Sequence, residues 1–223
     1  RLPANTPVID LSGDFRLKDV KTYEKYYGHP HKAPERLTDF VYGLTEFNRP
    51  RLVTTRAVAN PGCFATGVLL ALMPLALEGL LDVPVAVTGV TGSSGSGVEP
   101  KAGTHHPERA EAYRAYKPLT HQHLPEIVQS LAQAGATDVQ IAFVPHSAPM
   151  VRGIHVTALL QPRKPLDGPA AHAIFARHYG EERFVRLVDQ PPDCGVVAGS
   201  NFADVHAHAD GKSLCVLVAL DNL

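Results

Sequence analysis

An almost continuous apolar run dominates residues 58–81, which read VANPGCFATGVLLALMPLALEGLL. The run follows an Asn60-Pro61-Gly62 turn, in which proline fixes φ and glycine admits conformations that other residues avoid. It is long enough for a buried helix, with Pro74 as a kink and Gly79 near the end. Polar, glycine and proline residues interrupt it, so it falls short of the ~18 uninterrupted apolar residues of a membrane span.

Shorter patterns predict the remaining elements. Runs rich in β-branched residues predict strands at residues 7–11, 40–44 (a strand or a turn), 56–58, 83–90, 139–144, 154–160, 184–188, 202–206 and 214–220. Helical patterns predict helices at residues 18–28, 105–116, 127–134 and 170–179. The order of these elements predicts an α/β start, followed by an α+β part with a mixed, largely antiparallel sheet.

The composition excludes several classes of protein. The 223 residues are 44% hydrophobic and 19% charged, which suits an ordinary globular core. A formal net charge of −1 provides no electrostatic footprint for nucleic acid or an anionic membrane. Three cysteines form neither a disulfide framework nor a CxxC pair, which favours a reducing compartment. The chain begins with Arg1 and closes just after a strand pattern, so we expect both ends to continue in a longer protein.

Cys63 is the first candidate for chemistry, because the turn places it at or just before a helix N-terminus. Free N–H groups and the positive end of the helix dipole favour a thiolate there, and the thiolate is the nucleophilic form. A lone cysteine is more often a small packed hydrophobe. The preceding turn favours the reactive interpretation over the packed one.

Twelve histidines supply candidate bases and metal ligands. The pairs at 105–106, 121–123 and 206–208 match neither HExxH nor a zinc spacing with cysteine, so we expect no metal site. A cysteine nucleophile needs an acid or base within reach, and histidine titrates in the right range. Sequence spacing leaves four candidates open, which are His121, His123, His146 and His155.

Two loops follow predicted strands. Residues 12–16 lie at the carboxyl end of the first strand, where α/β sheets bind ligands, although Arg16 is by default a structural partner of Asp10 or Asp14. The Gly/Ser loop at residues 91–97 has a GxxGxG order and opens no apolar helix, so it fails as a dinucleotide fingerprint. Its backbone N–H groups suit an anion or a flat ring, and a flexible linker is the equal alternative.

Eight short segments together carry a resemblance to a known family. In order and approximate spacing, the chain resembles the N-acetyl-γ-glutamyl-phosphate reductases of arginine biosynthesis and their lysine-pathway aminoadipyl-phosphate reductase relatives. It is similar, more distantly, to aspartate-semialdehyde dehydrogenases. The segments are VIDLSGDFRL (8–17), VYGLTE (41–46), ANPGCFATG (59–67), SSGSG (93–97), AY…HQHLPEI (115–127), PHSAPMVRGI (145–154), GSNFADV (199–205) and DNL (221–223).

The resemblance implies two domains. Residues 1–60 would be the C-terminal part of a truncated NADP-binding Rossmann domain, whose Gly-rich fingerprint has no match here. Residues 61–223 would be the catalytic, substrate-binding and dimerisation domain, similar to the C-terminal domain of such dehydrogenases, with its own C-terminal end missing. The resemblance also implies a cytoplasmic homo-oligomer, a dimer or tetramer, that uses NADP(H).

The resemblance further implies a role for each matched residue. Cys63 would attack an acyl phosphate, release phosphate and form a thioester that hydride from NADPH reduces to a semialdehyde. His123 would be the acid/base, and Arg16 would bind the phosphate. Ser94 and Gly95 would lie near the nicotinamide. The other substrate-binding residues would be Asn60, Tyr116, His121 and Arg152.

Three alternatives stay open. Residues 105–109, HHPER, look more like lysine-pathway members, in which the substrate would be an aminoadipyl phosphate, N-acylated or linked to a carrier protein. More remotely, Cys63 and a histidine would serve an acyltransferase or hydrolase that needs no nicotinamide. In a binding or assembly module, Cys63 would be a packed residue with an unreactive thiol.

Overall fold

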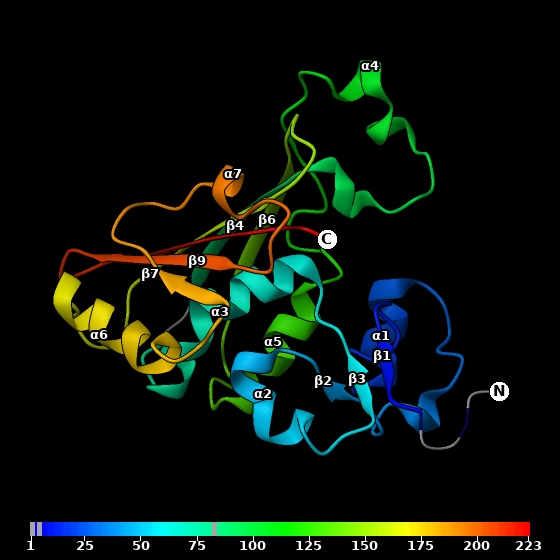
Figure 1. Cartoon of the computed structure of the whole chain (residues 1–223), viewed down its shortest axis with the longest axis horizontal. Helices are drawn as coiled ribbons and strands as arrows, with labels where there is room; N and C mark the ends of the chain where they lie inside the picture. Colours follow the sequence, from blue (N-terminus) through cyan, green and yellow to red (C-terminus); the bar gives the residue numbers. More distant parts are fainter. Residues whose placement is uncertain (1–2, 4–5, 82–83) are drawn as a thin grey trace. The chain divides into compact units, whose positions relative to one another are not determined.

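The computed structural model describes residues 3, 6–81 and 84–223 (Figure 1). The chain divides into two compact units, Arg1–Gly62 and Cys63–Leu223. That the first unit ends an NADP-binding domain stays a prediction. The strand expected at residues 83–90 is observed as β4 (Val85–Thr91), and its expected first residue, Val83, lies outside the described residues.

The first unit is built on a parallel three-stranded sheet, as the α/β start of the sequence predicts. Its order is β1 (Val8–Asp10), β3 (Ala57–Ala59), β2 (Val41–Tyr42). Helix α1 (Val20–Tyr27) begins after Asp19, whose carboxylate accepts the Thr22 N–H at 2.8 Å, a hydrogen bond typical of helix starts. It ends at Gly28, where φ is +78°, a conformation that favours glycine.

Helix α2 (Thr45–Leu52) of the first unit escapes prediction from the sequence. Its residues, TEFNRPRL, bury no side chain and include Pro50 inside the helix. An apolar period of 3.6 is therefore absent, and a proline normally indicates a helix boundary rather than an interior. A short 3-10 turn, Pro34–Arg36, lies in a segment for which the sequence predicts neither a helix nor a strand.

The second unit is built on a seven-stranded sheet. Its order is β5 (Arg114–Ala115), β6 (Ile141–Ser147), β4 (Val85–Thr91), β7 (Ile154–Leu160), β10 (Leu214–Leu220), β9 (Ala203–Ala209), β8 (Val185–Leu187). The pairs β4–β6 and β8–β9 are parallel, and the other neighbouring pairs are antiparallel. The expected mixed, largely antiparallel sheet is confirmed.

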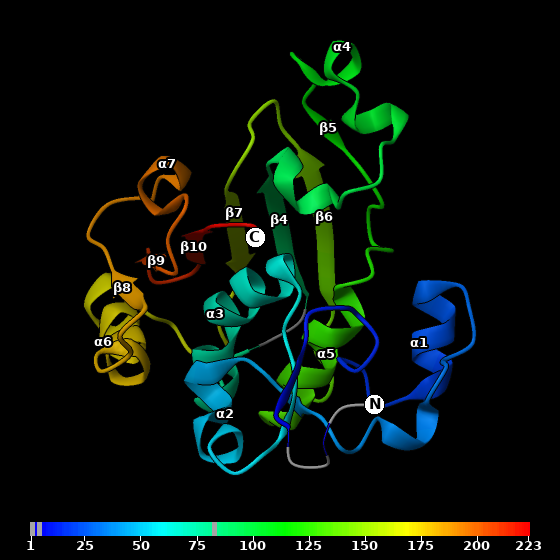
Figure 2. The same cartoon turned by 45° about the vertical axis from the view of Figure 1, so that its right-hand side comes forward.

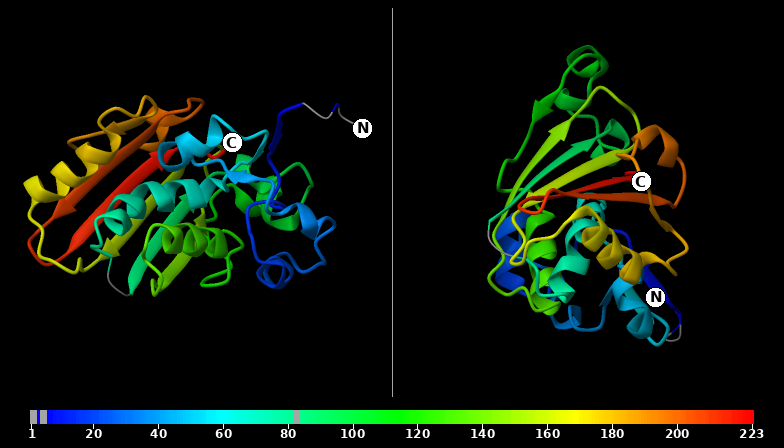
Figure 3. Two further views of the ribbon diagram at one scale, coloured as in Figure 1. Left: turned by 90° about the horizontal axis from the view of Figure 1, so that it is seen from below. Right: turned by 90° about the vertical axis from the view of Figure 1, so that its left-hand side faces the viewer.

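Three helices pack on one face of this sheet (Figure 3): α3 (Cys63–Leu77), α5 (Leu124–Gln133) and α6 (Gly168–Tyr179). Helix α3 packs against β7 and β10 on one side and against α5 and α6 on the others. A helix buried on all sides needs no polar face, which agrees with the apolar sequence of α3. Helix α3 therefore forms the core of the second unit. None of the helices in the part of the chain that the structure describes is both long and apolar enough to cross a membrane.

Helix α3 ends at Leu77 and includes Pro74, the residue at which the sequence predicts a kink. A proline within a helix has no N–H to donate to the carbonyl four residues earlier, here that of Leu70. The buried hydroxyl of Tyr179, at the end of α6, donates to the Leu70 carbonyl at 2.6 Å. A tertiary contact therefore replaces the hydrogen bond that the proline removes.

We expect Tyr179→Phe to lower the free energy of unfolding by about 1–3 kcal/mol, because it leaves the buried Leu70 carbonyl without this donor. Urea denaturation of this chain measures the change. Tyr113→Phe is the matched control, since Tyr113 is 60% exposed. A Tyr179→Phe variant as stable as the control would contradict the role given to the hydroxyl.

The helix predicted at residues 105–116 is wrong for most of its length. A four-residue helix, α4 (His106–Arg109), is followed by a turn and by β5, which pairs antiparallel with the end of β6. The spacing of the aromatic residues in this segment favours a helix, but pairing with the edge of the sheet determines the conformation of residues 114–115. The segment projects beyond the carboxyl ends of β4 and β6 (Figure 2). A further short helix, α7 (Cys194–Val197), has no signal in the sequence.

Candidate functional site

Cys63 is the first residue of α3, where the turn chemistry predicts it. Its side chain is half-buried. The next residue, Phe64, is buried and packs edge-on against Phe143 of β6, with ring centroids 5.3 Å apart. A β-carbon on Gly89 of β4 would lie only 2.5 Å from Cε1 of Phe64, so a glycine is needed there. The start of α3, and with it Cys63, is thus fixed on β4 and β6.

Two histidines pack against the ring that follows Cys63. His121 and His123 are buried just before α5, and their ring centroids lie 5.6 and 6.4 Å from that of Phe64. Nδ1 of His121 accepts the backbone N–H of His123 at 3.1 Å. Of the four candidate histidines, these two lie beside the helix start that carries Cys63.

His121 is neutral near pH 7. Burial, with a smaller effect from the charge of Lys117, lowers its pKa to about 4. Because its Nδ1 accepts a hydrogen bond, its proton resides on Nε2. His121 is therefore a hydrogen-bond donor rather than a cationic acid at this position.

His123 faces a buried carboxylate. Its Nε2 lies 3.9 Å from Oε1 of Glu126, whose side chain is only 1% exposed in the first turn of α5. A carboxylate beside an imidazole favours the charged imidazolium. The sequence shows Glu126 only as an acidic residue near a helix start, although a histidine three residues before a glutamate was a signal that could have been used.

Tyr116 completes this group. Its ring centroid lies 5.6 Å from that of His121, and its backbone N–H donates to Pro145 of β6. Burial, and the negative charge of a nearby Cys63 thiolate, raise the pKa of the Tyr116 hydroxyl. The phenol is thus a protonated donor within electrostatic reach of the nucleophile.

The other two candidate histidines lie on the opposite face of the sheet. His146 and His155 alternate with the buried residues of β6 and β7 that face α3, and alternate residues point to opposite faces. The ring of His146 stacks on Tyr113, with centroids 5.2 Å apart. Burial lowers the pKa of His155. The structure brings neither of them to Phe64.

A buried amide fixes the Gly/Ser loop, which forms a 3-10 turn, Ser93–Ser96. The Ser94 hydroxyl donates to Oδ1 of Asn222 at 2.8 Å, and the N–H of Gly153 donates to the same oxygen at 3.0 Å. Nδ2 of Asn222 donates to the Gly92 carbonyl at 3.2 Å. The loop is thus a fixed structure rather than the flexible linker that composition allowed, and sequence reasoning did not single out Asn222.

Arg152 already has a partner. Its guanidinium donates twice to the carboxylate of Asp221, at 2.9 and 3.2 Å. Burial acts to raise the pKa of Asp221, but the hydrogen bond from Arg152 holds this pKa below its usual value. The same carboxylate accepts the backbone N–H groups of Gly199 and Leu223. This pair braces the turn after β6 against the end of β10, next to the loop that Asn222 fixes.

Arg16 and Asn60 meet in the first unit. Nε of the largely buried Arg16 donates to the Asn60 carbonyl at 2.7 Å, and a terminal nitrogen donates to the Leu11 carbonyl at 3.2 Å. The neighbouring carboxylates accept other groups, since Asp14 accepts the Tyr23 hydroxyl and Asp10 accepts that of Ser12. The guanidinium is therefore held on the backbone at the carboxyl ends of β1 and β3.

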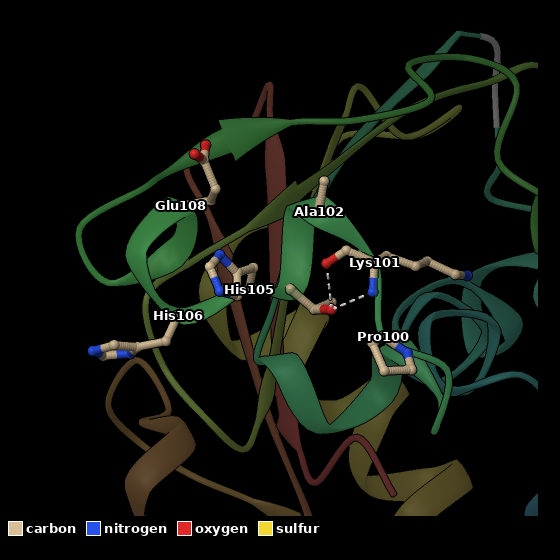
Figure 4. Close-up of a pocket in the computed structure, with 7 residues that line it drawn as sticks. Pro100, Lys101, Ala102, His105, His106 and Glu108 are labelled. Carbon is tan, nitrogen blue, oxygen red and sulfur yellow. Dashed lines mark hydrogen bonds between the residues drawn. The ribbon is translucent and has the colours of Figure 1, made fainter.

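The remaining histidine pairs lie apart from this group. His206 and His208 lie on β9, with Nδ1 of His206 2.9 Å from the Val188 carbonyl oxygen. His105 and His106 line an open pocket in the segment between β4 and β5, together with Pro100, Lys101, Ala102, Thr104 and Glu108 (Figure 4). The Thr104 hydroxyl donates to the Lys101 carbonyl at 3.0 Å. In the part of the chain that the structure describes, no three His, Cys, Asp or Glu residues gather as metal ligands would.

Comparison with known proteins gives consistent results. Residues 63–222 match the family model "Semialdehyde dehydrogenase, dimerisation domain". The chain is 43% identical to N-acetyl-gamma-glutamyl-phosphate reductase of Methanopyrus kandleri, over 100% of this chain and 65% of that protein. It is 40% identical to a putative [LysW]-L-2-aminoadipate 6-phosphate reductase of Thermomicrobium roseum, over 97% of this chain and 65% of that protein. It thus spans just under two thirds of these relatives.

The fold also has solved counterparts. Aspartate semialdehyde dehydrogenase II of Vibrio cholerae superposes with a TM-score of 0.69 at 16% identity, covering 96% of this chain and 67% of that one. A probable aspartate-semialdehyde dehydrogenase of Pseudomonas aeruginosa superposes with a TM-score of 0.63 at 19% identity, covering 98% and 68%. At these identities the likeness establishes the fold alone.

Proposed function

The chain belongs to the semialdehyde dehydrogenase dimerisation-domain family, and on that premise we propose that it carries the catalytic site of an NADPH-dependent N-acetyl-γ-glutamyl-phosphate reductase. One observation carries the proposal: Cys63 opens α3, and the two histidines that enter α5 pack against the ring of the next residue. A cysteine at a helix start with histidines beside it is suited to form and resolve an acyl-enzyme. Relatives at about 40% identity bear the reductase name.

In the proposed reaction, the Cys63 thiolate attacks the acyl carbon of the phosphorylated substrate. The bond to the phosphate oxygen breaks, inorganic phosphate leaves, and a thioester remains on Cys63. The Nε2–H of His121 and the Tyr116 hydroxyl are donors available to the substrate. His123, beside Glu126, then donates a proton to the alkoxide that hydride addition creates, which gives a hemithioacetal on Cys63. The same imidazole takes that proton back as the C–S bond breaks, and this frees the thiolate and the semialdehyde.

A nicotinamide cofactor, when bound, supplies the hydride, and Ser94 and Gly95 are the residues proposed to lie near its ring. The 3-10 turn Ser93–Ser96 carries no side chain larger than serine, so a flat ring can approach its backbone closely. Asn222 fixes that turn by its hydrogen bond with Ser94. NADP rather than NAD is part of the proposal, as is a homo-oligomeric assembly of the full-length protein.

The full-length protein tests the function in the reverse direction. With N-acetylglutamate semialdehyde, reduction of NADP should depend on phosphate, and arsenate should replace phosphate. A hydrolase or acyltransferase would consume an acyl ester with no nicotinamide. Absence of phosphate-dependent NADP reduction would refute the reductase assignment. The aminoadipyl alternative, favoured by the Thermomicrobium roseum relative, predicts a higher kcat/KM for the aminoadipate semialdehyde, free or carried by a protein.

We propose that Arg16 binds the leaving phosphate, because a guanidinium offers a planar fork that matches phosphate oxygens and a lysine does not. Arg16→Lys should therefore raise the KM for phosphate in the reverse reaction by about tenfold or more, with little change in the KM for NADP. Steady-state kinetics of the full-length enzyme measure both constants. Equal changes in the two, or none, would assign Arg16 only to the support of the Leu11 and Asn60 backbone.

A further inference from the structure

Arg109, the last residue of α4, is a buried cation. Its side chain is 9% exposed. One terminal nitrogen donates to the Ser147 hydroxyl and the other to the Ala148 carbonyl, both at 2.5 Å, with a longer contact of 3.3 Å to the Met150 carbonyl. All three acceptors are neutral. Within residues 3, 6–81 and 84–223, no carboxylate forms an ion pair with Arg109.

Two other arginines of the second unit show the usual arrangement. Arg152 donates twice to Asp221, and Arg186 donates twice to the buried Asp204 at 2.6 and 2.9 Å. Burying a charge is costly unless an opposite charge accompanies it. A guanidinium has five N–H donors, so Arg109 retains Nε–H and one terminal N–H beyond the contacts described. The site therefore has both the charge and the donors to receive an anion.

The position of Arg109 connects it to the nucleophile. Its acceptors lie at and just beyond the carboxyl end of β6, the strand whose Phe143 packs on Phe64 beside Cys63. Strand β5 pairs with the same end of β6 and leads directly to Tyr116. The hydroxyl of Tyr116 experiences two charges, the thiolate of Cys63 and the guanidinium of Arg109. The Tyr116 hydroxyl therefore lies within electrostatic range of both the nucleophile and the Arg109 guanidinium.

We propose that Arg109 binds an oxyanion of the substrate, either its carboxylate or its acyl phosphate, and so orients the acyl group toward Cys63. The proposal rests on the reductase function proposed above. It gives a function to the segment between β4 and β5 (Figure 2), because that segment places the Arg109 guanidinium at the carboxyl end of β6. The segment between β4 and β5 is thus a specificity element, and Arg109 is its residue that contacts the substrate.

The test compares two aldehydes with the full-length enzyme: N-acetylglutamate semialdehyde and 4-acetamidobutanal, which is the same molecule without its carboxylate. The preference is the ratio of their kcat/KM values in phosphate-dependent NADP reduction. If the carboxylate is the ligand, Arg109→Gln should reduce the preference by about 10–100-fold and leave 4-acetamidobutanal almost unaffected. If the phosphate is the ligand, the preference should persist and the KM for phosphate should rise by a similar factor.

The matched control is Arg186→Gln, which breaks the ion pair between Arg186 of β8 and the buried Asp204 of β9. It should lower stability while leaving the preference and the KM for phosphate unchanged. An Arg109→Gln enzyme with unchanged preference and unchanged phosphate KM would overturn the inference while the reductase function stands. A wild-type enzyme inactive on both aldehydes would instead refute the reductase function, and this inference with it.

A second measurement needs neither substrate nor cofactor. Iodoacetate is an anionic analogue of iodoacetamide, and both reagents alkylate cysteine thiols. If Arg109 attracts an oxyanion near Cys63, the ratio of iodoacetate to iodoacetamide rates at Cys63 should fall about tenfold in Arg109→Gln and much less in Arg109→Lys, which retains the charge. The same ratio in both variants and the wild type would contradict the proposal.

Discussion

Cys63→Ser is expected to abolish phosphate-dependent NADP reduction by the full-length enzyme, a loss on the order of 10⁴-fold or more, with the fold intact. A serine hydroxyl at the same helix start stays protonated near neutral pH, so the acyl phosphate meets no anionic nucleophile. Single-turnover assays of phosphate release and thermal unfolding of the variant measure both parts. Phosphate release at the wild-type rate in the variant would show that another group attacks the substrate.

The chain contains its own controls for the reactivity of this thiol. Burial, with a further effect from Asp193, raises the pKa of the Cys194 thiol to about 11, and burial raises the pKa of Cys215. Neither is expected to be a good nucleophile at neutral pH, whereas the start of α3 favours the Cys63 thiolate. Iodoacetamide at pH 7 should therefore modify Cys63 first, as peptide mass spectrometry can follow. Equal rates at the three cysteines would contradict the helix-start argument.

Local signals were sufficient to predict the element that carries Cys63. A turn of Asn, Pro and Gly followed by a long apolar run determines where α3 begins, because both features act within a few residues. The same signals cannot reveal which face of a sheet a histidine occupies. His146 and His155 differ from His121 and His123 in the direction of their side chains, which depends on strand registers set by distant residues.

The residues that sequence reasoning overlooked are charged or polar groups buried by tertiary contacts. Arg109 reads as one charge in a polar segment, and only the pairing of β5 with β6 reverses the chain so that its guanidinium is buried. Asn222 follows the last strand, and its hydrogen bonds reach Ser94, which is 128 residues earlier in the chain. Burial of a polar group has no periodic signature, since it depends on partners far away in the sequence.

The acid/base assignment leads to the second large effect. His123→Asn retains a polar side chain of similar shape but cannot deliver a proton, so the hydride step should slow by ~10²–10⁴-fold. Cys63 should still be acylated in this variant, because attack on the acyl phosphate uses the thiolate. In single-turnover experiments, the burst of phosphate should persist while NADPH oxidation becomes slow.

A substitution of Glu126 distinguishes a catalytic role of His123 from a purely structural one. If its carboxylate supports the His123 imidazolium across 3.9 Å, Glu126→Gln should slow the hydride step less than His123→Asn does, and shift its pH dependence toward lower pH. The pH profile provides the discriminating measurement, because a purely structural loss would lower the rate equally at every pH. His146→Asn is the control on the opposite face of the sheet, where the ring stacks on Tyr113. If that variant, rather than His123→Asn, lost the hydride step, the acid would have to act from the face of β6 that lies away from Phe64 and Cys63.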